Sequence, residues 1–231
     1  MPSLVKICGL STPASLEAAL GAGADMVGFV FFAKSPRHVS PDLARELGTR
    51  ARGRAKIVAL TVDADDEGLR AIVGVLPPDF LQLHGNETPA RVAAIGRTFG
   101  LPTIKAIGVA APSDLAAAKD YREVAAMMLF DAKAPRDADL PGGNGVPFDW
   151  RLLKGATGQR AYLLSGGLDA DNVAEAIALS GAQGVDVSSG VESAPGVKDE
   201  AKIEAFILRA RQAFRAADQK KAVREPAGRT A

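Results

Sequence analysis

The sequence contains a single cysteine, and its position makes it a candidate for chemistry. Cys8 is the last residue of an apolar stretch, and Gly9 follows it directly. A lone cysteine is most often a small buried side chain. A free thiol has a pKa of about 8.5, so a modest depression at the end of a strand would supply thiolate near neutrality. Cys8 is therefore a candidate nucleophile or base.

Asp131 ends another apolar stretch and is the candidate partner of Cys8. A carboxyl group at such a position commonly caps a helix or pairs with a buried lysine. In a partly dry cavity beside another acid, such as Asp186, its neutral form would be favoured and it could act as a general acid. Cys8 and Asp131 would then exchange protons with one substrate from opposite sides.

Two further side chains are candidates for contacts with a substrate. His84 ends the run Leu81-Gln82-Leu83-His84 and could be a core histidine, a hydrogen-bond donor to substrate or a second base. Arg37 follows Lys34-Ser35-Pro36 in a polar loop, where an arginine is usually solvated. If that loop folds over the cavity, the guanidinium group of Arg37 can grip a carboxylate through two hydrogen bonds.

Glycine-rich turns follow the last two apolar stretches of the chain. They read Ser165-Gly166-Gly167 and Ser188-Ser189-Gly190. Such turns can be simple chain reversals, but their exposed amides also bind phosphate. We therefore expect Gly166, Gly167, Ser189 and Gly190 to form a phosphate site. The residues favour a phosphosugar enzyme that transfers protons without a cofactor, and they do not identify the sugar.

Composition narrows the classes of function. The chain has 231 residues with 47% hydrophobic and 24% charged side chains, which is typical of a folded domain. A net charge of +1 argues against nucleic acid as a partner. One cysteine and two histidines exclude an internal disulfide and argue against a metal site. The absence of a signal-like or membrane-spanning run predicts a cytoplasmic protein without a membrane partner. The protein is expected to be a monomer or a homodimer, and the sequence does not decide between them.

Short apolar runs alternate with helical patterns along the chain. Eight runs are predicted as strands: Leu4 to Cys8, Met26 to Phe31, Lys56 to Val62, Phe80 to His84, Thr103 to Ile107, Met127 to Asp131, Ala161 to Ser165 and Gly184 to Val187. Strict alternation predicts an α/β fold of eight parallel strands, a single (β/α)8 TIM barrel. An open doubly wound sheet is the rival, but the first strand lacks the G-x-G-x-x-G turn that usually accompanies it.

The barrel domain is expected to cover residues 1–216, and residues 217–231 are expected to form a short disordered tail. The long connection from Ala132 to Phe148 has no helical pattern and is predicted to be a functional lid. Because alternate residues of a strand share a face, the side chains of Lys6, Cys8 and Asp186 should point into the barrel. Active sites of such barrels lie at the carboxyl ends of the strands.

An ordered set of motifs resembles the phosphoribosylanthranilate isomerases of tryptophan biosynthesis, from about Val5 to Phe206. The motifs are Val5 to Leu10, Gly28 to Phe31 with Lys34 to Arg37, Leu81 to Gly85, Phe130-Asp131 with Gly142 to Gly145 and Phe148 to Trp150, Leu164 to Leu168, and Gly184 to Glu192. Any one of them is weak, whereas the ordered set is specific to the family.

The resemblance implies an Amadori rearrangement of N-(5-phosphoribosyl)anthranilate. It gives Asp131 the role of acid toward the ring oxygen and Cys8 the role of base toward carbon two of the ribose. It gives Arg37 the anthranilate carboxylate, and it gives the glycine-rich turns the phosphate. His84 and Asp186 would line the pocket.

The sequence departs from the family pattern at two loop positions. Asn144 stands where a threonine is usual, and Ala170 stands where a proline is usual. These departures concern lid closure and loop rigidity. The alternatives are a histidine-pathway isomerase, a ribulose-phosphate epimerase, and a catalytically silent barrel that binds a phosphometabolite. Retention of Cys8 and Asp131 and the scarcity of histidine argue against them.

Overall fold

Eight parallel strands close into a barrel in the computed structural model, which describes residues 3–133, 147–155 and 161–224. The strands are β1 (Leu4–Cys8), β2 (Met26–Phe31), β3 (Lys56–Thr61), β4 (Phe80–Leu83), β5 (Thr103–Val109), β6 (Met127–Ala132), β7 (Tyr162–Leu164) and β8 (Gly184–Val187). β1 pairs with both β2 and β8, so the sheet has no free edge. The predicted (β/α)8 barrel is confirmed, and the open sheet is excluded.

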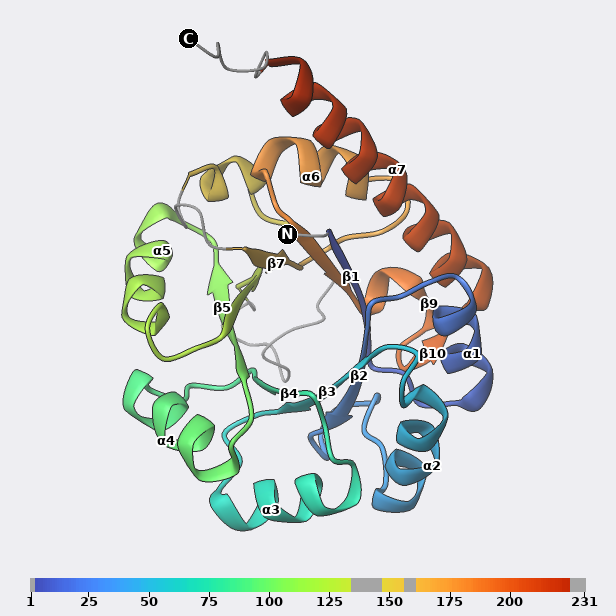
Figure 1. Cartoon of the computed structure of the whole chain (residues 1–231), viewed down its shortest axis with the longest axis vertical. Coiled ribbons are helices and arrows are strands. Elements are labelled where there is room, and N and C mark those ends of the chain that lie inside the picture. The colour runs from blue at the N-terminus through green and yellow to red at the C-terminus, as the bar shows by residue number, and fades with distance from the viewer. Residues whose placement is uncertain (1–2, 134–146, 156–160, 225–231) are drawn as a thin grey trace, which may run out of the picture.

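Helices form a ring around the strands (Figure 1). They are α1 (Pro13–Gly21), α2 (Pro41–Ala51), α3 (Asp66–Val75), α4 (Pro89–Phe99), α5 (Pro112–Ala118), α6 (Val173–Ser180) and α7 (Glu200–Arg224). Three short 3-10 helices accompany them: η1 (Lys119–Tyr121), η2 (Trp150–Leu153) and η3 (Ser189–Val191). Between β6 and β7 the described residues include η2, and most of the predicted lid, including Asn144, lies outside the described residues.

Side-chain caps determine where several helices begin. A Ser, Thr or Asp side chain accepts a hydrogen bond from a first-turn amide at the start of each of four helices, α1 to α4: Thr12, Ser40, Asp65 and Thr88. Each such bond satisfies an amide that the helix itself leaves without a partner. Proline in the first turn of α1, α2 and α4 reinforces the start, because its fixed φ suits a helix.

Each strand separates two cores, as the alternation of side chains predicts. Val5 and Ile7 of β1 pack in the core between the strands and the helices. Cys8 packs inside the barrel with Val30 and Leu60. A second interior layer lies near the starts of the strands: Met26, Val58, Ile104, Ala106, Leu129 and Leu163. The interior is thus apolar near the strand starts and bears its charged groups further along.

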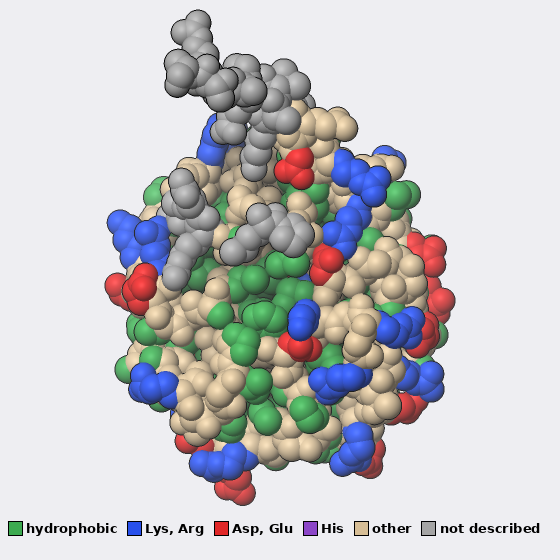
Figure 2. All heavy atoms as spheres, viewed as in Figure 1, with side chains coloured by type: hydrophobic (Ala, Val, Ile, Leu, Met, Phe, Trp, Pro, Cys, Tyr) green, Lys and Arg blue, Asp and Glu red, His purple; other side chains and the backbone are tan. Residues whose placement is uncertain are grey.

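The apolar interior layer reaches the molecular surface on one face. Figure 2 shows hydrophobic side chains gathered at the centre of the face, with charged side chains around its rim. The partly buried members of the interior layer are Leu4, Phe80 and Met127, each the first residue of its strand. These side chains cover the amino-terminal end of the barrel, so the opposite end is left for polar chemistry.

The predicted strands agree with the observed ones to within two residues at each end. A small antiparallel hairpin was not predicted: β9 (Glu192–Ala194) and β10 (Val197–Lys198) follow η3 and pair with each other. These strands are two and three residues long and contain charged residues, so they lack the apolar run on which strand prediction depends.

The last helix extends beyond the predicted end of the barrel domain. α7 runs from Glu200 to Arg224, so residues 217–224 are helical rather than part of a tail that begins at residue 217. This segment contains Ala, Gln, Lys and Arg, which are good helix formers, and no proline occurs between Glu200 and Pro226. Residues 225–231 lie outside the described part of the chain. Within that described part, no helix combines the length and the hydropathy needed to cross a bilayer.

The packing of α7 can be tested with two residues of the same helix. Phe206 is fully buried, whereas Leu208 is 58% exposed. We expect Phe206→Ala to lower the free energy of unfolding by about 3–5 kcal/mol, because it leaves a cavity against the barrel. Leu208→Ala should change it by less than about 0.5 kcal/mol. Urea denaturation followed by circular dichroism measures both; equal effects would contradict this account of the packing.

Candidate active site

The candidate side chains converge on the carboxyl-terminal end of the barrel. Cys8 is the last residue of β1, Asp131 is the penultimate residue of β6, and His84 follows β4 directly. All strands are parallel, so these ends share one mouth. Cys8 and Asp131 are only 3% and 5% exposed, respectively. The structure therefore brings the predicted thiol and carboxyl group to the same end of one barrel, on non-adjacent strands.

A buried ion pair lies immediately beneath Cys8. The ammonium group of Lys6 donates to Asp186 Oδ1 at 2.7 Å, and both side chains are at least 95% buried. Ser165 Oγ donates to the other carboxylate oxygen of Asp186 at 3.4 Å. Burial alone would lower the pKa of Lys6, but Asp186 and Cys8 outweigh it and raise that pKa. Lys6 is therefore a permanent positive charge inside the barrel, and its partner, which the sequence left open, is Asp186.

Burial raises the pKa of the Cys8 thiol. Lys6 opposes that rise, and Asp186 adds to it. This rise is opposite to the modestly lowered pKa that we expected for Cys8 from the sequence. A thiol with a raised pKa holds its proton at neutral pH, but the thiolate, once formed, is a stronger base than an ordinary one.

Gly28 on the neighbouring strand makes room for this arrangement. A Cβ atom at position 28 would lie 2.9 Å from Cys8 Sγ and 3.2 Å from Lys6 Nζ. Both distances are shorter than ordinary van der Waals contacts, so any side chain there would displace the thiol or the ammonium group. The glycine in the Gly28 to Phe31 motif thus has a steric role in the site.

Asp131 is held by His84 rather than by a second acid. His84 Nε2 lies 3.2 Å from Asp131 Oδ2, and His84 Nδ1 lies 3.0 Å from Gln82 Nε2. Asp131 Oδ1 accepts from the amide of Ala132 at 2.9 Å. The sequence analysis placed Asp186 beside Asp131; instead Asp186 is engaged by Lys6 and Ser165, and no hydrogen bond joins the two acids.

Arg37 is buried and already paired through two nitrogens. Its Nε and Nη2 atoms donate to the two carboxylate oxygens of Glu192 at 2.7 and 2.8 Å. Burial raises the pKa of Glu192, but Arg37 and Lys198 outweigh that effect and lower it overall, so Glu192 is ionised. Nη1 of Arg37 makes no hydrogen bond within the described part of the chain. One nitrogen of Arg37 thus remains for a substrate. From the sequence we expected the guanidinium group to be free to bind a carboxylate through two hydrogen bonds.

The glycine-rich turns meet at the ends of β7 and β8. Gly166 and Gly167 have φ angles of +87° and +65°, a conformation that side chains rarely tolerate. A Cβ atom on Gly190 would lie 1.8 Å from the carbonyl oxygen of Leu168, so only glycine permits the close approach of the two turns. The amides of Gly166, Gly167, Ser189 and Gly190 donate no hydrogen bond to any described residue, which suits an anion.

A second buried network supports the mouth on the opposite side. Lys105 donates to Glu87 at 2.7 Å and to the carbonyl of Gly85 at 2.6 Å. Glu87 also accepts from the amide of Gly85, which follows His84. The sequence did not single out Glu87, because a glutamate in a polar loop carries no signal of burial.

Comparison with known proteins assigns the family. The family model described as N-(5'phosphoribosyl)anthranilate (PRA) isomerase matches residues 5–209. The chain belongs to this family. It is an isomerase of tryptophan biosynthesis, as the motifs predicted.

Named relatives cover nearly the whole chain. The N-(5'-phosphoribosyl)anthranilate isomerase of Rhodopseudomonas palustris strain BisB18 is 60% identical over 211 residues, which are 91% of this chain and 97% of that protein. The enzyme of the same name from Bradyrhizobium diazoefficiens is 58% identical over 224 residues, 97% of this chain and all of that protein.

Solved structures of phosphoribosylanthranilate isomerases share the fold. The Thermotoga maritima enzyme is 35% identical, has a TM-score of 0.81, and the match covers 91% of this chain and 99% of that one. Another structure of the family contains reduced 1-(o-carboxyphenylamino)-1-deoxyribulose 5-phosphate, at 33% identity and a TM-score of 0.78, with the same coverage.

One departure from the usual isomerase sequence has a structural substitute. At Ala170 the resemblance led us to expect a proline, and hydrogen bonds from side chains on both sides of Ala170 restrain the turn. Asp169 Oδ1 accepts from the amides of Asp171 and Asn172 at 2.9 Å. Asn172 Nδ2 donates to the carbonyl of Gly167 at 2.8 Å. These bonds restrain the turn after β7 in place of the ring of a proline.

The pKa of Cys8 can be measured directly, because it is the only cysteine of this isomerase. Alkylation by iodoacetamide requires the thiolate, so its rate follows the deprotonated fraction. We expect the rate to rise with pH and to reach its midpoint above that of a free cysteine in a short peptide. Mass spectrometry of the intact chain measures the reaction, and Cys8→Ser is the unreactive control. A midpoint below that of the peptide would contradict the raised pKa.

Proposed function

We propose that this chain converts N-(5'-phosphoribosyl)anthranilate to 1-(2-carboxyphenylamino)-1-deoxyribulose 5-phosphate, with Asp131 as general acid and Cys8 as general base. The observation that carries the proposal is the placement of one buried thiol and one buried carboxyl group at the same barrel mouth. Membership in the isomerase family supplies the substrate.

The rearrangement needs one proton delivered and one removed. Asp131 donates a proton to the ring oxygen of the ribose, the bond between carbon one and that oxygen breaks, and the nitrogen lone pair forms a protonated Schiff base. Cys8 thiolate then removes the proton from carbon two, and the electron pair moves to give an enolamine. Tautomerisation of the enolamine gives the ketone. Because acid and base stand on different strands, each reaches its own atom of the sugar.

The surroundings of each group suit its task. His84 fixes the orientation of the Asp131 carboxyl group through Nε2. Lys6 stabilises the negative charge that forms on Cys8, while Asp186 keeps Lys6 in place. His84 and Asp186 thereby line the substrate site and position the acid and the base. A strong base is required because the proton on carbon two is only weakly acidic.

The two charged ends of the substrate have separate binding groups. The amides of Gly166, Gly167, Ser189 and Gly190 bind the phosphate through backbone hydrogen bonds, which needs glycine for the close approach of the chain. Arg37 binds the anthranilate carboxylate through Nη1 while Glu192 holds its other two nitrogens. A solved structure of a relative contains the reduced form of the proposed product, which supports a ligand with a phosphate at one end and a carboxyphenyl group at the other.

The setting of the enzyme follows from this chemistry. We place it in the cytoplasm, acting on a small phosphosugar rather than on nucleic acid or a membrane, as a monomer or homodimer. Acid–base catalysis of this reaction uses neither a metal nor a cofactor. A relative from Thermotoga maritima is described as dimeric, with monomers generated from it.

The roles of acid and base predict the effect of removing either group. Cys8→Ala and Asp131→Asn should each lower kcat by at least about 100-fold, because proton transfer in the transition state contributes that much or more. The assay is the loss of anthranilate-type fluorescence when freshly prepared phosphoribosylanthranilate is added. Circular dichroism checks that the variants remain folded. If the unaltered protein leaves the fluorescence unchanged while binding the substrate, it is a silent phosphometabolite-binding barrel instead.

The role of Arg37 predicts a loss that depends on the substrate carboxylate. Arg37→Ala should lower kcat/KM, because it removes a charged hydrogen-bonding partner from a buried site. The expected loss of transition-state stabilisation is about 2–4 kcal/mol. Arg45→Ala is the matched control, because Arg45 is exposed and pairs with Asp42 on the same helix. Steady-state fluorescence assays give both values. A specificity constant that does not change in Arg37→Ala would remove Arg37 from the substrate site.

A further inference from the structure

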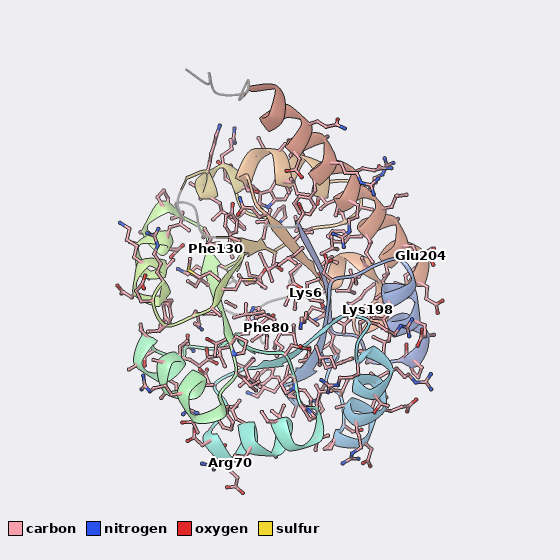
Figure 3. The ribbon with its side chains drawn as sticks, viewed as in Figure 1. Lys6, Arg70, Phe80, Phe130, Lys198 and Glu204 are labelled. Atoms are coloured by element: carbon pink, nitrogen blue, oxygen red, sulfur yellow. The ribbon has the colours of Figure 1, made fainter. Side chains whose placement is uncertain are left out.

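Lys198 is a buried lysine that the acid–base mechanism does not use. It is the last residue of β10, and its side chain is only 1% exposed. Figure 3 shows Lys198 and Lys6 inside the ring of helices, with Arg70 and Glu204 on the periphery. An ammonium group is costly to bury, so it is retained inside a protein only where its surroundings satisfy it. The contacts of Lys198 show what it connects.

Among the described residues, the Lys198 ammonium group donates hydrogen bonds to Ser188 and Glu192. Nζ donates to the carbonyl of Ser188 at 2.8 Å, to the hydroxyl of Ser188 at 3.2 Å and to Glu192 Oε1 at 2.8 Å. The Ser188 hydroxyl in turn donates to the carbonyl of Cys8 at 3.1 Å. Ser188 is also the residue before the phosphate turn at Ser189. One link therefore joins Lys198 to the base and to the phosphate turn.

The second link leads to the carboxylate-binding arginine. Glu192 Oε1 accepts from both Lys198 and Arg37, at 2.8 and 2.7 Å. The stem of Arg37 lies over the residue after the catalytic cysteine, since a Cβ atom on Gly9 would be 2.7 Å from Arg37 Cδ and 3.1 Å from Ser188 Oγ. Any movement of Glu192 would therefore displace Arg37, whose stem packs against Gly9 beside Cys8.

We propose that Lys198 is a positioning residue that holds Cys8, the Ser188–Gly190 turn and Arg37 in one arrangement. The proposal rests on the function given above and adds to it a single residue on which the base, the phosphate turn and the carboxylate contact all depend. The hairpin of β9 and β10 is not part of the barrel. In this proposal its role is to place the ammonium group of Lys198 beside Ser188 and Glu192.

The charges of the cluster give Lys198 a second effect. Burial lowers the pKa of Lys198, and Glu192 opposes that fall. When Lys198 is protonated, it and Arg37 carry two positive charges and Glu192 carries one negative charge, so the cluster has one positive charge in excess near the thiol. Lys198 lowers the pKa of Cys8, although burial raises it more. Removing the ammonium group should therefore reduce the thiolate fraction of Cys8 at any pH near neutrality.

Lys198→Met tests both effects, because it keeps the length of the side chain and removes the charge. We expect the midpoint of Cys8 alkylation to move up by about 0.5–1 pH unit. We also expect KM for phosphoribosylanthranilate to rise, because Arg37 loses its support, and kcat/KM at pH 7 to fall at least about tenfold. Lys56→Met is the control, since Lys56 is exposed and pairs with Asp79 at the other end of the barrel.

Two further variants separate charge from position. Lys198→Arg keeps the charge but cannot reproduce three bonds from one nitrogen, so the alkylation midpoint should stay while KM rises. The double variant Lys198→Met with Glu192→Gln restores one excess positive charge, so its midpoint should return toward the original value while KM stays raised. These variants also retain a test if Lys198→Met alone fails to fold.

The outcomes distinguish this inference from the proposed function. If the unaltered protein has no isomerase activity, the proposed function fails, while the alkylation midpoints still report the link between Lys198 and Cys8. If the unaltered protein is active and Lys198→Met changes neither the midpoint nor KM, the positioning role is wrong and the isomerase function stands. An equal loss in Lys56→Met would also overturn the positioning role.

Discussion

Lys6 and Asp186 face each other across the ladder that joins the first strand of the barrel to the last, with 2.7 Å between ammonium and carboxylate. Two charges buried this deeply stabilise the structure only as a pair, since either one alone would lack a counter-charge in a poorly solvating interior. Because the pair spans the two strands that close the barrel, closure of the barrel also determines the charge next to Cys8. A barrel that failed to pair β1 with β8 would leave both charges unpaired, and Cys8 would lose the positive charge beside it.

The same burial determines what kind of base Cys8 is. A thiol at the surface would have a larger thiolate fraction at neutral pH but would be a weaker base toward carbon. Inside the barrel, burial raises the pKa of Cys8, and the positive charges of Lys6 and Lys198 partly offset that rise. The site therefore combines a strong base with a nearby charge that stabilises it after deprotonation. Asp131 differs in its surroundings, because its carboxyl group is oriented by His84 and a backbone amide.

Substrate binding depends on segments that follow the last strand of the barrel. The turn at Ser188, the short helix η3 and the β9–β10 hairpin all come after β8. Ser188 nevertheless contacts Cys8 at the end of β1, and Glu192 contacts Arg37 in the loop after β2. Because β1 and β8 are neighbours in the closed sheet, the carboxyl ends of the first and last strands meet at the site. The last connection thus completes the binding site that the first connections begin.

The sequence by itself determined the barrel and the chemical identity of its candidate groups. Apolar runs of strand length alternate with helical spacing, and local periodicity of this kind depends only on neighbouring residues. It also identified Cys8, Asp131 and the glycine turns, because their positions at strand ends follow from the same pattern. Only the tertiary structure decided the partners: Asp186 with Lys6, His84 with Asp131, and Glu192 with both Arg37 and Lys198. Those pairs join residues up to 180 positions apart, and the direction of the Cys8 pKa shift depends on burial that only packing creates.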